Sequence, residues 1–283
     1  MHMMRNILSI DVEEVFHGEY TRHLREQNMV FRTPFNIPPI LRLLKERDVK
    51  ATFFVVGEIA EKFPETINMI AEEGHEVAFH SYDHKPLREK NREQLEAEIE
   101  RFNVLLKSKI GERCMGFRAP SYSLDNKTKW AFEVFEKVGM LYDSSIFPAW
   151  TPLYGVPGAP LKPYKPSKDD LTLEDSAGKV WEFPLAVYSL FGLRIPAAGG
   201  FYLRLIPNFV RRALKQINKM GTPATIYIHN WELDHETPKL NLNPYGSFVT
   251  YHNIEKTKEL FKQLLNDFQF TSFKDYMQAT GID

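Results

Sequence analysis

The sequence predicts an α/β fold in which helices cover a mainly parallel sheet. Short apolar stretches rich in β-branched and aromatic residues alternate with stretches of helical periodicity along the 283 residues. Polar side chains suited to catalysis follow several predicted strands, which favours a barrel, because the carboxyl ends of its strands converge on one mouth. No glycine-rich phosphate loop follows a strand, which argues against a nucleotide-binding open sheet.

The composition is that of an ordinary globular protein that can bury a large core, with 43% hydrophobic residues. Thirty-six Lys and Arg residues balance 37 Asp and Glu residues, so we expect no nucleic acid partner. The single cysteine, Cys114, excludes an internal disulfide and a cysteine metal cluster. We see no secretory segment and no apolar run near the roughly 20 residues of a membrane helix. We therefore expect no transmembrane segment and a cytoplasmic location.

Strands and helices are predicted to alternate regularly in the first half of the chain. Strands are expected at residues 7–10, 50–56, 76–79 and 114–117. Helices are expected from about residue 36, at residues 58–73 with an interruption at Pro64 and a C-cap at Gly74, and at residues 91–109. In the last of these, Leu95, Ile99 and Phe102 share one helical face, which predicts core packing.

The second half of the chain is less regular. Strands are expected at residues 140–142, 180–183 and 224–228, and helices at residues 126–138, 207–219 and 253–268. Residues 148–166 are rich in Pro, Gly and Tyr and show no periodicity. We therefore expect a long irregular loop within one domain, of the kind that often contacts substrate.

Three side chains form a candidate metal site, and a fourth lies beside it. His80 and His84 follow the predicted strand at residue 76, and two neutral imidazoles at this spacing can hold one divalent ion, although chance also produces it. Asp11 and Glu13 are two positions apart, so both carboxylates point to one side of an extended chain. Glu13, His80 and His84 would form a set that leaves positions open for water and substrate, as catalytic Zn²⁺ requires. Co²⁺, Ni²⁺ or Mn²⁺ would also fit.

The remaining polar residues at strand ends supply acid and base chemistry. Asp11 would stay off the metal and take a proton from water whose pKa the metal lowers. Arg118 would hold Asp11 ionised and oriented through a charge-assisted bond. His229 is expected to be the general acid for the departing amine. This arrangement predicts metal-assisted hydrolysis of an amide or ester.

These motifs resemble those of the polysaccharide deacetylases of the NodB homology type, carbohydrate esterase family four. Residues 9–14 (Ser-Ile-Asp-Val-Glu-Glu) resemble the first motif, and residues 80–84 its His-Ser-x-x-His. Residues 118–121 (Arg-Ala-Pro-Ser) and 226–229 (Ile-Tyr-Ile-His) resemble two later motifs in the same order. The resemblance implies a distorted (β/α) barrel of about seven parallel strands with the active site at their C-terminal ends. It also implies a metal-dependent deacetylase that removes N-acetyl, or O-acetyl, groups from a carbohydrate.

Substrate contacts are expected from three further residues. The resemblance places the backbone N–H of Ser121 where it would help bind the tetrahedral oxyanion. Tyr122 and Trp231 offer aromatic rings that can stack on sugar faces, although Trp231 is equally consistent with the core.

Two assignments stay open from the sequence alone. The family's first motif has adjacent aspartates, whereas Val12 follows Asp11 here, so Glu14 competes with Glu13 as the metal ligand. Either Asp143 or Glu182 is expected to hold the second nitrogen of His229.

The resemblance extends to a subgroup associated with exopolysaccharide loci that carries a C-terminal extension. We therefore expect one domain, residues 1–283, with a catalytic barrel at residues 1–234 and an extension at residues 235–283 packed on it. Two rival hypotheses remain. One is an amidohydrolase acting on a small non-sugar or cyclic amide, and the other is a barrel that binds carbohydrate without catalysis.

Overall fold

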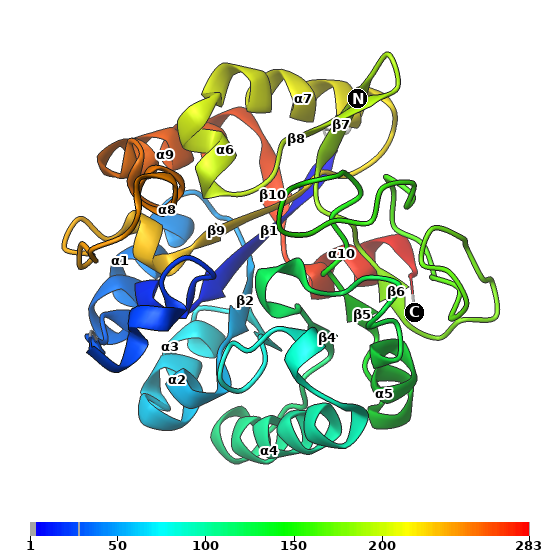
Figure 1. The fold of residues 1–283 in the computed structure, drawn as a ribbon, viewed down its shortest axis with the longest axis horizontal. Helices are drawn as coiled ribbons and strands as arrows, with labels where there is room; N and C mark the ends of the chain where they lie inside the picture. Colours follow the sequence, from blue (N-terminus) through cyan, green and yellow to red (C-terminus); the bar gives the residue numbers. More distant parts are fainter. Residues whose placement is uncertain (1–3, 28, 283) are drawn as a thin grey trace.

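A computed structural model describes residues 4–27 and 29–282. At its centre, eight strands pair in parallel in the order β10-β1-β2-β3-β4-β5-β6, with β9 also paired to β1. The strands are β1 (Arg5–Val12), β2 (Thr52–Val55), β3 (Glu76–Phe79), β4 (Gly116–Phe117), β5 (Tyr142–Asp143), β6 (Trp181–Glu182), β9 (Thr225–His229) and β10 (Gln269–Thr271). The sheet curls into a distorted barrel, as predicted (Figure 1).

Helices surround the curled sheet (Figure 1). The α-helices are α1 (Thr33–Lys45), α2 (Gly57–Lys62), α3 (Glu65–Glu72), α4 (Arg92–Ile110), α5 (Ala131–Val138), α6 (Gly200–Leu205), α7 (Pro207–Lys219), α8 (Pro244–Tyr251), α9 (Thr257–Asp267) and α10 (Phe273–Thr280). Short 3₁₀ turns are η1 (Val15–His17), η2 (Arg22–Gln27), η3 (Leu87–Glu89), η4 (Pro120–Tyr122), η5 (Asn230–Leu233) and η6 (Ile254–Lys256). Within the described ranges, no helix has the length and apolar character needed to cross a membrane.

Strand β1 separates two environments because its side chains alternate between the two faces of the sheet. Leu8 and Ile10 belong to the large core under the outer helices. Ile7 belongs to a second cluster inside the barrel, together with Phe54 and Phe273. Asp11 has the same parity as Ile7 and therefore points into the barrel at the opposite end of the strand.

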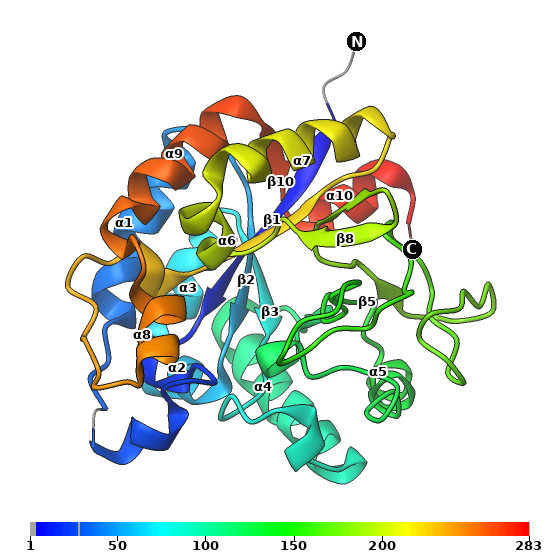
Figure 2. The same cartoon turned by 45° about the horizontal axis from the view of Figure 1, so that its top comes forward.

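The last helix closes the N-terminal end of the barrel. Phe273, at the start of α10, stacks on Tyr142 with ring centroids 4.7 Å apart, and its backbone N–H donates to Thr52 Oγ1 at 3.0 Å. Figure 2 shows α10 beside β10 and the beginning of β1. The barrel is thus filled at one end, and its polar side chains gather at the other.

The structure departs from the predicted elements where local signals were weak. The helix expected from Asn36 begins at Thr33, because Pro34 occupies a position in the first turn where its missing N–H costs nothing. The antiparallel hairpin of β7 (Val187–Leu190) and β8 (Leu193–Pro196) was not predicted. All of its residues except Val187 are half-buried or exposed, so the hairpin lacks the alternation of buried apolar residues that marks a core strand. The predicted break at Pro64 does separate α2 from α3.

Candidate active site

Asp11 and Arg118 form a buried ion pair inside the mouth of the barrel. Arg118 Nη1 donates to Asp11 Oδ1 at 2.6 Å and to Ser9 Oγ at 2.7 Å. The other guanidinium nitrogens donate to Ser144, Nε to the carbonyl oxygen and Nη2 to the hydroxyl, both at 2.9 Å. The ring of Phe54 lies 4.2 Å from the centre of the guanidinium. The carboxylate is therefore held in one orientation, with the contact to Arg118 that the sequence predicted.

Glu13, His80 and His84 converge beside this pair. One candidate ligand atom from each lies within 4.8 Å of the other two, and all three residues are buried. Glu13 Oε2 is 2.6 Å from His84 Nε2. His80 Nδ1 is 2.8 Å from the carbonyl oxygen of Arg118, which leaves its Nε2 for a ligand. Buried acceptor atoms as close as those of Glu13 and His84 need a proton or a cation between them, so these residues fit a divalent ion.

Glu14 has a different position and a different partner. Its Oε1 accepts hydrogen bonds from the backbone N–H of Arg32 at 2.9 Å and from the N–H and hydroxyl of Thr33 at 2.8 and 2.6 Å. These groups lie at the start of α1, where backbone donors have no partner within the helix. Glu14 thus caps α1, and Glu13 is the carboxylate of the two that lies with the histidines.

Burial and neighbouring charges set the protonation states of His80 and Glu13. Burial lowers the pKa of His80 to about 4, so the ring is neutral at pH 7, the form that binds a metal. Burial by itself raises the pKa of Glu13, but His84 and His229 outweigh it and leave that pKa well below its usual range. Glu13 is therefore ionised.

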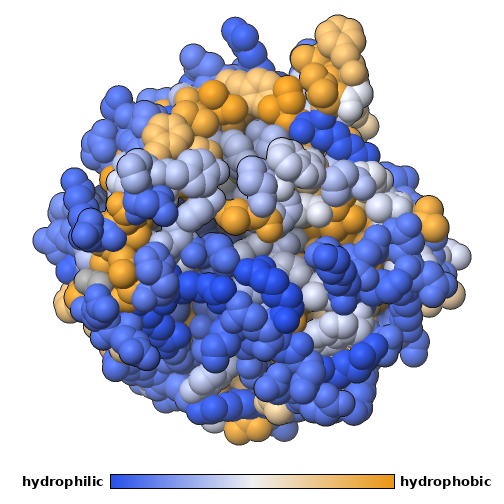
Figure 3. Space-filling model, in the orientation of Figure 1, coloured by the Kyte–Doolittle hydropathy of each residue, from blue (hydrophilic) through white to orange (hydrophobic). Residues whose placement is uncertain are grey.

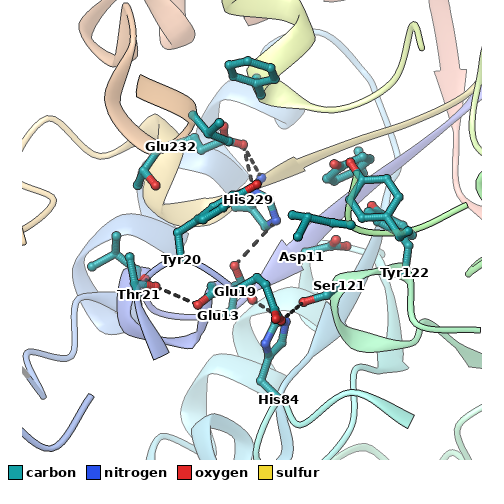
Figure 4. A pocket seen from close by; sticks show the side chains of 18 of the residues that line it. Asp11, Glu13, Glu19, Tyr20, Thr21, His84, Ser121, Tyr122, His229 and Glu232 are labelled. Carbon is teal, nitrogen blue, oxygen red and sulfur yellow. Dashed lines mark hydrogen bonds and ion pairs between the residues drawn. The ribbon is translucent and has the colours of Figure 1, made fainter. Parts of the chain in front are cut away.

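His229 lies across the cavity at the end of β9 (Figure 4). Its Nε2 is 3.5 Å from Glu13 Oε1, and its Nδ1 is 2.9 Å from Glu232 Oε2. Burial alone would lower the pKa of His229, but the carboxylates of Glu13 and Glu232 outweigh it and raise the pKa to about 9. The imidazole is protonated at neutral pH, as a general acid requires.

Glu232 is a site residue that sequence reasoning missed. The expectation that Asp143 or Glu182 would hold the second nitrogen of His229 is wrong. Glu232 lies one 3₁₀ turn after His229 and also accepts a hydrogen bond from its backbone N–H at 3.0 Å. Arg204 of α6 pairs with Glu232 Oε1 at 3.0 Å. The three-residue spacing was the available signal, because residues three apart lie on one side of such a turn.

Asp143 and Glu182 instead support the loop behind the site. Asp143 accepts hydrogen bonds from the N–H and hydroxyl of Ser145 at 3.0 and 2.7 Å, and Ser145 Oγ accepts from Ala119 N–H at 2.7 Å. Burial raises the pKa of Asp143 to about 6 and that of Glu182 well above its usual range. Glu182 Oε1 accepts a hydrogen bond from the N–H of Ile146 at 2.9 Å. Asp143, through Ser145, fixes the segment that follows Arg118.

Ser121 and Tyr122 lie where the sequence placed them, in the loop after β4. Both have positive φ, 52° and 49°, a backbone region that non-glycine residues adopt mainly where the surrounding structure holds them. Ser121 Oγ donates to Glu19 Oε2 at 3.1 Å. The ring of Tyr122 is buried and meets that of Tyr227 edge-to-face at 5.0 Å.

Trp231 is buried and contacts both His229 and Glu13. Its ring stacks on His229 with centroids 5.2 Å apart and planes at 15°. Its indole N–H donates to Glu13 Oε1 at 3.0 Å. The ring that was expected to meet a sugar is thus covered on one face by His229 and positions Glu13 with its polar edge.

One cavity is lined by all of the predicted site residues except Arg118. Figure 3 shows it as a hollow near the centre of this face. Its lining includes Asp11, Glu13, His80, His84, Ser121, Tyr122, His229, Trp231 and Glu232. A reacting group in this cavity would meet a carboxylate on an arginine, a candidate metal set and a protonated imidazole together.

Two family models match adjacent parts of the chain. Residues 31–140 match Polysaccharide deacetylase, and residues 144–278 match a domain of unknown function, DUF3473. The first of these matches relates the chain to the polysaccharide deacetylase family. A Bacillus cereus protein named peptidoglycan-N-acetylglucosamine deacetylase is 40% identical over 98 residues, which are 34% of this chain and 35% of that relative. The chain therefore spans about a third of that family member's length.

Solved structures described as members of this family have the same fold as the chain. A Mycobacterium smegmatis protein described as a polysaccharide deacetylase superposes with a TM-score of 0.62 at 18% identity, over 99% of this chain and 92% of that chain. A mutant of a CE4 family pseudoenzyme, with restored enzymatic activity, superposes with a TM-score of 0.50 at 14% identity, over 97% and 68%. At these identities the likeness confirms the distorted barrel alone.

Proposed function

We propose that this protein is a metal-dependent deacetylase that hydrolyses N-acetyl, or O-acetyl, groups of a carbohydrate. The observation that carries the proposal is the convergence in one cavity of Glu13, His80 and His84 with Asp11 and His229. The match of residues 31–140 to the polysaccharide deacetylase family supports a sugar as the substrate, because a similar protein is named for an N-acetylglucosamine unit.

Glu13, His80 and His84 would hold the divalent ion. Bound there, it would polarise the acetyl carbonyl and lower the pKa of the attacking water. Two imidazoles and one carboxylate suit Zn²⁺, and the same donors accommodate Co²⁺, Ni²⁺ or Mn²⁺.

The chain's own residues move the protons. Asp11, oriented by Arg118, accepts a proton from water as the water oxygen attacks the acetyl carbon. His229 donates its proton to the leaving nitrogen as the carbon–nitrogen bond breaks, and the products are acetate and the free amine. Glu232 holds the imidazole in the orientation that directs Nε2 into the cavity. The backbone N–H of Ser121 would stabilise the oxyanion of the tetrahedral intermediate.

Acetate release from N-acetylglucosamine oligomers, measured with and without a chelator, tests the proposal. We expect release that the chelator abolishes and added Zn²⁺ restores. The Asp11→Asn variant should keep the metal and lose most of the release. Release from small non-sugar amides alone would assign the chemistry to another amidohydrolase. Glycan binding without acetate release under any of the four metals would favour a barrel that binds carbohydrate without catalysis.

A further inference from the structure

The β7–β8 hairpin carries an apolar face that extends past the helix on which it packs. Its register pairs Tyr188 with Ile195 and Leu190 with Leu193, and because side chains alternate along a strand, all four share one face. At the base of the hairpin, Tyr188 meets Phe209 of α7 with ring centroids 6.2 Å apart. Toward the tip, Leu190 is 39% exposed and Leu193 is 69% exposed. The part of this face near the tip is therefore left to solvent.

The turn of the hairpin holds a residue that the turn itself does not favour. Phe191 and Gly192 form the turn with φ of +49° and +80°, and two-residue turns of this kind prefer Asn before Gly. The ring of Phe191 is 98% exposed. A bulky side chain in this backbone region costs stability, and this one buries almost no surface against the chain. The fold gains nothing from the ring, which points to a contact outside the chain.

Helix α7, on which the hairpin packs, supplies positive charge beside the tip. Residues 183–231 contain six Lys or Arg residues and no Asp or Glu, although the whole chain has a net charge of -1. Three of the six, at spacings of three and four, are exposed on one face of the helix: Arg212, Lys215 and Lys219. Within the described ranges these three side chains form no ion pair, whereas Arg211 pairs with Asp267. We call these three residues the basic face of α7.

The hairpin and α7 lie along one edge of the molecule. Figure 1 shows α7 at the top of the view and the hairpin projecting beyond it. Figure 3 shows an apolar projection at that place, with strongly hydrophilic side chains beside it. At about 3.3 Å per residue, the four residues of β7 carry the tip roughly 10 Å from the base of the hairpin. This length matches the depth of roughly 5 to 10 Å to which apolar faces enter the boundary between lipid headgroups and acyl chains.

The combination of an apolar tip and unpaired cations selects the class of partner. At the surface of a bilayer, the apolar tip can enter the acyl boundary while Lys and Arg side chains stay at anionic headgroups. A nucleic acid would attract the cations but would give the aliphatic side chains of the tip no apolar surface, because its outer face consists of phosphates. An anionic lipid surface therefore satisfies both halves of this edge.

We infer that the tip of the β7–β8 hairpin and the basic face of α7 bind the surface of a membrane that contains anionic lipids. The chain attaches to this surface without crossing it. Phe201 and Tyr202 of α6, the helix directly before α7, line the cavity, so a surface bound at α7 lies beside the mouth of the candidate active site. The inference does not depend on the proposed function, because this binding uses neither the metal nor the catalytic residues.

The test is sedimentation of the full chain with vesicles made of equal parts of phosphatidylglycerol and phosphatidylcholine, compared with vesicles of phosphatidylcholine alone. We expect stronger binding to the anionic vesicles, and this binding should weaken as salt is added. Lys215→Gln should lower the partition coefficient roughly fivefold, because it removes one cation from the bound surface. Phe191→Asn should lower it roughly tenfold or more, because no ring enters the apolar layer. Since Asn suits the turn, unfolding does not explain that loss.

Matched substitutions elsewhere on the surface serve as controls. Lys107→Gln removes an exposed cation from α4, which Figure 1 shows at the edge opposite α7. Phe35→Asn removes a ring that is 67% exposed on α1. Both variants should bind the anionic vesicles as well as the unmodified protein does. If either control loses as much binding as its counterpart in the hairpin or in α7, the assigned surface is wrong.

Other outcomes would overturn the inference in distinct ways. Absence of binding to the anionic vesicles, or equal binding to both kinds of vesicle, would remove the anionic membrane as the partner. Retention of a DNA duplex that Lys215→Gln weakens, without vesicle binding, would assign the basic face to a nucleic acid. A concentration-dependent dimer that Phe191→Asn abolishes, again without vesicle binding, would assign the tip to a second copy of the chain. Asp11→Asn should bind the vesicles like the unmodified protein, so failure of the proposed function leaves this inference standing.

Discussion

The two matched segments of the chain build their shares of the site in different ways. In residues 31–140, strands β2, β3 and β4 alternate regularly with helices, and a short loop after β3 carries His80 and His84. In residues 144–278, long loops, a hairpin and short helices intervene before β9 delivers His229. Because β9 pairs with β1 from Ile7 to Asp11, the irregular segment completes the barrel that the regular one begins. The comparison teaches that the candidate metal set and the acid have separate structural origins and can be removed separately.

The largest effect is expected at the carboxylate that meets both segments. Glu13→Gln should weaken metal binding on the order of a hundredfold, because it removes an ionised ligand atom. Glu14→Gln is the matched control one position away. It should keep the metal and lose about 1 kcal/mol of stability, because Glu14 caps α1. Metal titration and thermal unfolding of both variants decide the matter. Loss of the metal in Glu14→Gln with retention in Glu13→Gln would show that Glu14, and not Glu13, is the metal ligand.

A smaller effect is expected behind the acid in the irregular segment. Glu232→Gln should lower kcat by roughly tenfold to a hundredfold, because the imidazole loses the carboxylate that orients and charges it. Metal affinity should stay close to that of the unmodified protein. Steady-state kinetics with Glu236→Gln as control checks this, since Glu236 is exposed and lies against Arg32. Equal kcat in the two variants would remove Glu232 from the site.

Part of the site could be predicted from sequence because parallel strands bring their carboxyl ends together. That geometry alone places Asp11, Glu13, His80, Arg118 and His229 at one mouth. The two-residue spacing of Asp11 and Glu13 further separates base from ligand, and the structure shows this separation.

The remainder depends on contacts that no local pattern encodes. Arg204 reaches Glu232 from a short helix with no clear periodicity, and α8 joins the cavity through long-range packing. The indole N–H of Trp231 pairs with Glu13 across 218 positions of sequence, which spacing rules cannot anticipate.

The pH dependence of stability should report on the closed end of the barrel. Glu76 there accepts hydrogen bonds from Thr52, Tyr142 and the N–H of Lys274, and burial raises its pKa. The folded protein therefore binds this proton more tightly than the unfolded chain. The stability that this contributes at low pH is lost as pH rises through the raised pKa. Glu76→Gln should flatten that decline in unfolding free energy. A steeper decline in the variant would contradict the assignment.

The smallest effect is expected in the hairpin of the irregular segment. Phe191 has φ of +49° in the turn between β7 and β8 and is followed by Gly192, with φ of +80°. Asn tolerates this backbone region better than Phe, so Phe191→Asn should raise the unfolding free energy by about 0.5 to 1 kcal/mol. Chemical unfolding and an acetate assay provide the check. A loss of activity would mean that the hairpin serves the site.

The most direct test that the candidate metal set and the general acid have separate structural origins measures metal content and acetate release together in His80→Ala and His229→Ala. The account predicts that His80→Ala loses both the metal and the release. It predicts that His229→Ala keeps one metal ion per chain and releases acetate on the order of a hundredfold more slowly. Full metal content in His80→Ala, or an undiminished rate in His229→Ala, would contradict the account.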